Sequence, residues 1–302
     1  MRLPSFCLTF ASLMTVIGLA ALPAAPRHPS VNLSARHRHP AADCSDLEMR
    51  FDDRDAVVRS ESRTFSRAEA PVLTVHPHAN GGTQVVGWEQ NNYSVTACKA
   101  VAPGDSAESV LSQITLSVDN GAVSTSGPGQ EEQWTVYLLI RAPKSAALEL
   151  DTMNGPISVY DVDGKLTAHA HNGPISLHNF SGDAEVTAQN GPISLDGSRG
   201  NIRIKTQNGP ISVDLKETRW NGAGLSVAAE NGPVTLRVPS GFQSSFLVES
   251  TPYAPMSCRA SICESARKTW DDEHRRIEYG SSPAVVHLST VNGPVSVEQA
   301  GD

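Results

Sequence analysis

Three histidines, His169, His171 and His178, come closest to a chemically competent cluster in this 302-residue sequence. Imidazole nitrogens bind transition metals, so a metal site shared by neighbouring strands is one interpretation of their spacing. A polar surface that carries separate, exposed imidazoles is the simpler interpretation. We therefore expect no metal site at these histidines.

Paired carboxylates are the second arrangement that could do chemistry, because two acids flanking a glycosidic bond can hydrolyse it. Asp161 and Asp163 lie close together, but the equivalent positions later in the chain do not repeat the acids: Asn179 and Ser181, then Gly197 and Arg199. The sequence also lacks a serine nucleophile elbow, a phosphate loop and a dinucleotide fingerprint. We expect no catalytic residues and no cofactor, with a carbohydrate-active lyase or hydrolase on a β-helix as the alternative.

The cysteines indicate an oxidising compartment. Cys7 falls in a leader segment, which leaves Cys44, Cys98, Cys258 and Cys263 as an even set that favours disulfides in an exported chain. Three pairings are possible, and nearness in sequence favours Cys258 with Cys263 and Cys44 with Cys98. A zinc site is disfavoured because the late pair lacks a second ligand pair at suitable spacing.

Residues 1–25 are expected to be a signal peptide. Arg2 is their single charge, an apolar run follows, and small residues end the segment. The protein should therefore act in the periplasm, at the cell surface or in the medium. It would contact the membrane only if the leader stays uncleaved, because the apolar run approaches spanning length. The net charge of −8, with both signs scattered, predicts no nucleic-acid partner.

An internal repeat sets the architecture. Asn-Gly-Pro occurs six times, with spacings of 18, 18, 18, 23 and 61 residues, at Asn154, Asn172, Asn190, Asn208, Asn231 and Asn292. Looser Asn-Gly steps at Asn80 and Asn120 extend the series. On both sides of each turn, apolar residues or threonine alternate with outward residues. An example is Ile202/Ile204/Thr206 before Asn208 and Ile211/Val213 after it. The residues Ile114/Leu116/Val118 before Asn120 fit the same pattern.

Each 18-residue unit thus predicts two short strands that cannot bury their apolar face alone. Stacked units bury it in a continuous core, so the predicted fold is an all-β, single-stranded β-helix or solenoid, favoured as right-handed. An antiparallel sandwich gives no reason to keep Asn-Gly-Pro in phase. A left-handed hexapeptide helix fails because Asp163 and His169 stand where aliphatic residues are required.

The six repeated asparagines are predicted to form a structural ladder, because stacked Asn side chains can bond to one another. Asn and Gly also tolerate the backbone of a tight corner. A uniform hydroxyl column stands four residues after each asparagine: Ser158, Ser176, Ser194, Ser212, Thr235 and Ser296. We interpret this column as ordinary exposed sheet surface, with binding of glycans or ordered water as the alternative.

The expected organisation is a signal peptide at 1–25, a flexible lead and N-terminal cap at 26–66, and a β-solenoid at 67–302. An insertion at about 252–282 interrupts the solenoid, and it should form a loop or short helix carrying Cys258 and Cys263.

These units resemble the bacterial putative-adhesin family of β-solenoid repeat proteins, related to the head domains of auto-transporter adhesins. The resemblance rests on successive strand and N-G-x-[IV]-x-[VL] units from about Pro71 to the end, and is most specific at 147–238. It implies a right-handed β-helix with a surface role. The expected function is a non-catalytic adhesin-like or structural protein, whose partner would be a glycan or another cell-surface ligand.

Overall fold

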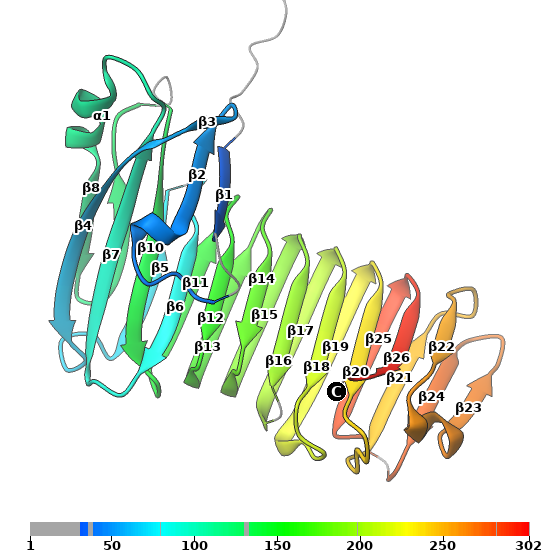
Figure 1. Cartoon of the computed structure of the whole chain (residues 1–302). Helices are drawn as coiled ribbons and strands as arrows, with labels where there is room; N and C mark the ends of the chain where they lie inside the picture. Colours follow the sequence, from blue (N-terminus) through cyan, green and yellow to red (C-terminus); the bar gives the residue numbers. More distant parts are fainter. Residues whose placement is uncertain are drawn as a thin grey trace, which may run out of the picture.

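The computed structural model describes residues 31–35, 39–78, 80–129, 133–197, 199–281 and 283–301. The expected signal peptide and most of the lead that follows it lie outside these residues. The described chain is mostly β, and two long, largely parallel sheets dominate it, an arrangement consistent with a β-helix (Figure 1). No helix within the described ranges is long and apolar enough to cross a membrane.

One long sheet has eleven strands among the described residues and is called the 11-stranded sheet. In spatial order its strands are β22 (Met256–Cys258), β26 (Val295–Gln299), β20 (Val234–Val238), β18 (Ile211–Leu215), β16 (Ile193–Gly197), β14 (Ile175–His178), β12 (Ile157–Tyr160), β6 (Thr83–Trp88), β10 (Trp134–Pro143), β7 (Asn92–Val101) and β4 (Val57–Ser66).

The other long sheet, called the 12-stranded sheet, is ordered β23 (Arg267–Trp270), β24 (Arg275–Tyr279), β21 (Phe246–Ser250), β25 (Val286–Asn292), β19 (Asn221–Asn231), β17 (Arg199–Asn208), β15 (Ser181–Asn190), β13 (Asp163–Ala170), β11 (Ala147–Thr152), β5 (Val72–His76), β9 (Ala122–Ser126) and β8 (Thr115–Asp119). The described residues also include three short helical elements, α1 (Ala107–Gln113), η1 (Cys44–Asp46) and η2 (Ser261–Glu264), and a small third sheet.

The strands β11 to β20, residues 147–238, form what we call the central stack. Here the chain alternates between the two sheets, and each strand pairs in parallel with the next strand of the same sheet, for example Ile175 with Ile193 and Ile193 with Ile211. Apolar residues alternate with polar ones along each strand, so every second side chain faces the space between the sheets. Ile175, Ile193 and Ile211 are at most 1% exposed. Like residues therefore stack in columns to form the core.

The corners of the central stack require glycine because neighbouring turns approach closely. A Cβ atom on Gly191 would lie 2.3 Å from the carbonyl oxygen of Gly173, and one on Gly209 would lie 2.3 Å from that of Gly191. No side chain fits at that separation. The glycine of the repeat thus allows one turn to stack directly on the preceding one.

At the N-terminal end, the order of strands in space differs from their order in the chain. β9 pairs with β5 and β10 with β6, both in parallel, so this later strand pair lies outside the earlier one. The chain then passes to β11 on the far side of β5. β10, β7 and β4 continue the 11-stranded sheet with antiparallel pairing. Along the chain, β7 and β8, within residues 92–119, therefore interrupt the parallel stacking, which resumes with β9 and β10.

The interpretation of Ile114/Leu116/Val118 as a repeat unit was wrong. Ile114 caps α1, and Leu116 and Val118 lie in β8, which forms an antiparallel hairpin with β9. Asn120 and Gly121 are the hairpin turn, with φ values of 48° and 85°. An Asn-Gly pair favours such a two-residue turn, and alternating apolar residues do not report the direction of the neighbouring strand.

The segment expected to be a flexible lead and cap contains regular structure where it is described. β1 (Val31–Ala35), β2 (Leu47–Phe51) and β3 (Arg54–Asp55) form a small antiparallel sheet. Its side chains Leu47, Met49 and Phe51 pack on β7 and β10 in a separate apolar cluster. β4 follows as the edge of the 11-stranded sheet.

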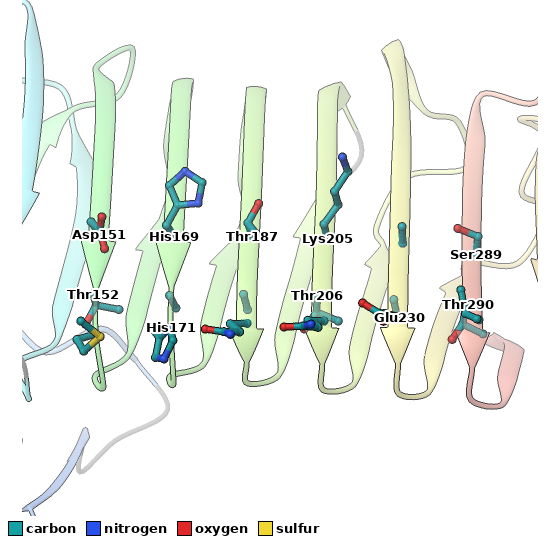
Figure 2. A pocket seen from close by; sticks show the side chains of 18 residues that line it. Asp151, Thr152, His169, His171, Thr187, Lys205, Thr206, Glu230, Ser289 and Thr290 are labelled. Carbon is teal, nitrogen blue, oxygen red and sulfur yellow. The ribbon is translucent and has the colours of Figure 1, made fainter.

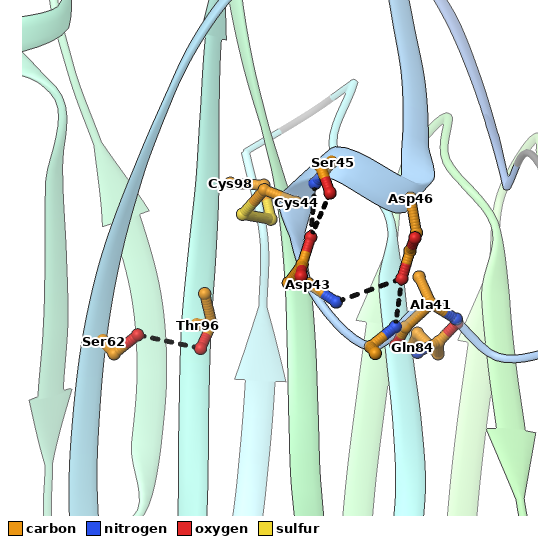
Figure 3. Close-up of a disulfide and its surroundings, with 10 residues drawn as sticks. Ala41, Asp43, Cys44, Ser45, Asp46, Ser62, Gln84, Thr96 and Cys98 are labelled. Carbon is orange, nitrogen blue, oxygen red and sulfur yellow. Dashed lines mark hydrogen bonds between the residues drawn. A yellow bond between two sulfur atoms is a disulfide. The ribbon is translucent and has the colours of Figure 1, made fainter.

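Covalent and polar contacts fasten this N-terminal segment to the large sheet (Figure 3). A disulfide joins Cys44 in η1 to Cys98 in β7. Close by, the Ala41 amide donates to Gln84 Oε1 at 2.9 Å, and Gln84 Nε2 donates back to the Ala41 carbonyl at 2.8 Å. The segment is thus held against β6 and β7.

The C-terminal end shows a second transposition of strand order. After β20 the chain leaves one position open, forms β21 and β22 beyond it, and returns to fill the gap with β25 and β26. Figure 1 shows the red strands β25 and β26 between the yellow and orange parts of the chain. The segment 252–282 was expected to be a loop or short helix, but it supplies strands β22, β23 and β24 as well as η2. The antiparallel hairpin of β23 and β24 extends the 12-stranded sheet.

Candidate functional site

The repeated asparagines lie in one exposed column at the corner of the stack. Each Nδ2 donates to the Oδ1 of the asparagine before it in space, from Asn292 to Asn231 and onward to Asn154, at 2.9 or 3.0 Å. Asn154 donates in turn to Asn80, so the looser Asn80-Gly81 step belongs to the same column. Within the column each amide between the two ends thus donates one hydrogen bond and accepts one, which is half of its hydrogen-bonding capacity. Their contribution to stability stays a prediction.

A groove runs along the outer face of the 12-stranded sheet beside this column, with a volume of about 780 Å³. Six neighbouring strands line it, β11, β13, β15, β17, β19 and β25 (Figure 2). Two rows of outward side chains border it. The first row lies three residues before each asparagine: Asp151, His169, Thr187, Lys205, Ala228 and Ser289. The second row lies directly before each asparagine: Met153, His171, Gln189, Gln207, Glu230 and Val291.

The groove exists because side chains alternate along each strand end. On β17, Lys205 and Gln207 are exposed, whereas Thr206 between them is 4% exposed and faces the core. The intervening residues are all small, alanine or threonine, in the six strands. The space between the two rows is therefore open, and its floor is the face of the sheet.

Most polar side chains of the two rows have no partner within the protein. Among the described residues, the structure gives no side-chain hydrogen bond or ion pair to eight of them: Asp151, His169, His171, Thr187, Gln189, Lys205, Gln207 and Glu230. The hydroxyl of Ser289 instead donates to the Val227 carbonyl. The groove thus offers amide, hydroxyl, imidazole, ammonium and carboxylate groups that remain available.

The outer face of the 11-stranded sheet differs, because several of its polar side chains bind one another. Ser194 donates to Ser176 at 3.0 Å, and Ser296 donates to Thr235 at 3.1 Å. Arg237 donates to the hydroxyl of Ser212 and pairs with Glu298 at 3.3 Å. The hydroxyl column seen in the sequence is therefore largely engaged in contacts within its own face.

The three histidines that suggested a cluster are separated. His169 and His171 lie on the 12-stranded sheet, and Figure 2 shows them on opposite sides of the groove. His178 lies in β14 of the other sheet, stacked on Tyr160 with ring centroids 4.6 Å apart. A hydrogen bond with His178 lowers the pKa of Asp196. No group of three histidine, cysteine or acidic residues in the described chain is placed to hold a metal.

The candidate catalytic acids are engaged with side chains of later coils of the stack. Asp161 Oδ1 accepts a hydrogen bond from Asn179 Nδ2, and Asp163 pairs with Arg199 at 2.8 Å. The first contact joins corresponding positions of successive coils, 18 residues apart, and the second reaches from β13 across β15 to β17, 36 residues apart. A structural role explains these acids without any reaction.

The two disulfides join Cys44 to Cys98 and Cys258 to Cys263, which is the pairing that nearness in sequence favoured. Such bonds form and persist in oxidising compartments. They suggest that the protein works outside the cytoplasm.

The groove was not predicted from the sequence. The inward columns and the hydroxyl column repeat the same kind of residue in every unit, whereas the two rows of the groove differ chemically from strand to strand. The varied outward residues one and three positions before each repeated asparagine were the feature of the sequence that could have indicated the groove. Its significance depends on the distances between strands, which the sequence does not give.

Comparison with known proteins yields structural matches only. No protein-family model matches the sequence, and no curated protein matches it. Solved structures of bacterial putative adhesins match it over about four fifths of its length at low identity. A putative cell adhesion protein from Clostridium sporogenes is 12% identical, with a TM-score of 0.32, and the match covers 81% of this chain and 100% of that one. A putative adhesin from Bacteroides fragilis is 11% identical, with a TM-score of 0.38, and the match covers 80% and 97%. The names of these two structures describe adhesion and no enzyme.

Proposed function

We propose that this protein is a non-catalytic, adhesin-like binding protein that acts outside the cytoplasm, and that the groove on the 12-stranded sheet is its binding surface. One observation carries the proposal: eight polar side chains along the groove have no partner within the protein, whereas the opposite face binds its own polar groups. An exposed polar surface gains binding energy most readily where its groups are not already engaged.

The scaffold that we propose is a right-handed β-solenoid with coils of about 18 residues and a cleaved leader at 1–25. The parallel register supports the solenoid, since residues 18 apart pair in β13, β15 and β17. A rigid stack fits a binding role because it holds outward side chains in regular rows. Residues on regular strands are positioned more accurately than residues on loops.

Binding of the labelled, purified protein to intact bacterial cells and to envelope fragments tests the proposal. A groove variant would carry Gln189→Ala, Lys205→Ala and Gln207→Ala, and a matched control would carry Ser176→Ala, Ser194→Ala and Ser212→Ala on the opposite face. We expect the groove variant to lose most binding and the control to retain it, with both folded by circular dichroism. Loss of binding in the control alone would place the binding surface on the other sheet.

The alternative of a carbohydrate-active enzyme is tested in the same samples. The wild-type protein is incubated with plant, animal and bacterial polysaccharides, and new reducing ends and unsaturated sugars are measured. We expect neither product. Cleavage that stops when Asp161, Asp163 or His169 is changed to alanine in a folded variant would establish the enzyme.

A further inference from the structure

We infer that the groove binds a linear glycan that lies along the axis of the stack, in which neutral sugars separate the acidic ones and one acidic sugar contacts Lys205. The inference rests on the proposed function and names the ligand of that same surface. Three properties of the groove carry it: its length, the kind of hydrogen-bonding groups that it offers, and the placement of its charges.

The length of the groove indicates an extended polymer. It crosses six neighbouring strands, and strands in a sheet lie about 4.8 Å apart, so it runs for roughly 24 Å. The two rows repeat once per strand. A chain of sugar rings in an extended conformation can place successive rings against successive strands, whereas a compact molecule would occupy only part of the groove.

The hydrogen-bonding groups of the groove favour a glycan over a peptide. The floor is the face of a sheet, whose backbone amides and carbonyls already pair between strands along the axis. An extended peptide would find no backbone partners there, and leaving its amide groups unpaired is costly. Sugar hydroxyls are arranged around the edge of each ring, where Thr187, Gln189 and Gln207 can donate to them and accept from them.

The apolar side of a sugar ring also has a suitable counterpart. Between the two rows the floor carries the backbone of small residues, including Ala170 and Ala188, which leaves a smooth strip along the centre. Met153 and Val291 in the second row are 51% and 49% exposed, at the two ends of the groove. These apolar surfaces can pack against the C–H groups of the rings.

The charges place one acidic sugar near the middle. Lys205 lies in the fourth of the six strands and makes no ion pair with a carboxylate, while Asp151 lies in the first strand and Glu230 lies in the fifth strand, in the other row. An ammonium group without a partner favours a ligand carboxylate. The acids in the groove and the net charge of −8 oppose a polymer with a charge on every ring. A glycan in which neutral sugars separate the acidic ones satisfies both conditions.

Titration calorimetry with three hexasaccharides tests the inference on the purified mature protein. The probes are cellohexaose, which is neutral, hyaluronan hexasaccharide, in which acidic and neutral sugars alternate, and hexagalacturonate, which is acidic at every ring. We expect hyaluronan hexasaccharide to bind most tightly, cellohexaose more weakly and hexagalacturonate least.

Two matched variants locate the charge contact. Lys205→Gln should lower the affinity for hyaluronan hexasaccharide by roughly tenfold and leave that for cellohexaose unchanged, because one charge-assisted hydrogen bond is lost. Lys165→Gln, which changes an exposed lysine outside the groove on the same sheet, should change neither affinity. Gln189→Ala with Gln207→Ala should weaken both sugars.

The results separate this inference from the proposed function. If none of the three sugars binds at millimolar concentration, or if the groove variants bind all three as the wild type does, the glycan assignment is overturned. Groove-dependent adhesion to cells would still stand in that case, with a ligand of another class. If adhesion also fails to depend on the groove, the proposed function falls as well.

Discussion

The central stack and the two ends of this protein use the same sheets in different ways. From β11 to β20 the order of strands in each sheet follows the order in the chain, and each strand pairs with its neighbours in parallel. At both ends two strand pairs lie in space in the reverse of their order in the chain. Each end also has an antiparallel hairpin and a disulfide. Regular stacking needs only repetition, whereas ending a stack needs elements that cover or redirect its open edges.

The largest effect should come from a charge in the centre of the stack. Ile193→Asp places a carboxylate in a column between Ile175 and Ile211, where it has no partner. Burying that charge should lower the free energy of unfolding by about 5 kcal/mol, measured by denaturant titration. Ser194→Asp on the same strand, with its side chain outward, is the control and should cost far less. Equal losses in the two variants would contradict the assignment of inward and outward columns.

The two disulfides should differ in a way that distinguishes the two ends. Cys44 and Cys98 are 54 residues apart, and Cys258 and Cys263 are 5 apart, so the first restrains the unfolded chain more strongly. By loop closure, replacing both cysteines of a pair with alanine should cost roughly 4 kcal/mol at the N-terminal end and roughly 2 kcal/mol at the C-terminal end. Denaturant titration of each double variant measures this. A larger loss at the C-terminal end would show that native packing, rather than loop entropy, decides the difference.

A methyl group at a corner tests how tightly the turns of the central stack approach. Gly191→Ala brings a Cβ atom to within 2.3 Å of the Gly173 carbonyl oxygen and should cost about 3 kcal/mol. Gly104→Ala is the matched control, because no heavy atom lies within 4 Å of its added Cβ. Thermal melts of both variants make the comparison. If Gly191→Ala melts like the wild type, the corners are not closely stacked.

The smallest effect should separate the middle of the asparagine column from its end. Asn190 both donates to Asn172 and accepts from Asn208, whereas Asn292 only donates to Asn231. Asn190→Ala should therefore cost about 1 kcal/mol, and Asn292→Ala about half as much, since exposed hydrogen bonds contribute modestly. The difference is measured by denaturant titration of the two single variants. Equal costs would indicate that the asparagines act through their own turns and not through the column.

The pairs Asn80-Gly81 and Asn120-Gly121 show where prediction from the sequence ended. Both resemble the repeat, but Asn80 joins the asparagine column and Asn120 turns a hairpin. The difference lies in what each following strand pairs with, β6 in a parallel sheet and β9 in an antiparallel hairpin. The alternation of apolar residues is the same in both cases, so it could not distinguish them.

By itself the sequence determined the inward columns of the central stack, because period-two alternation states them locally. Its even set of four cysteines predicted disulfides, and nearness in sequence favoured one of three possible pairings without fixing it. It also determined the identity of the outward residues in the groove. Only the tertiary structure decided that two rows of unlike residues border one groove. It also decided that His178 and His169 lie on opposite sheets, and that β25 lies between β19 and β21. Each of these depends on which strands become neighbours in space, and that choice is made by packing energy over the whole core, which no local pattern records.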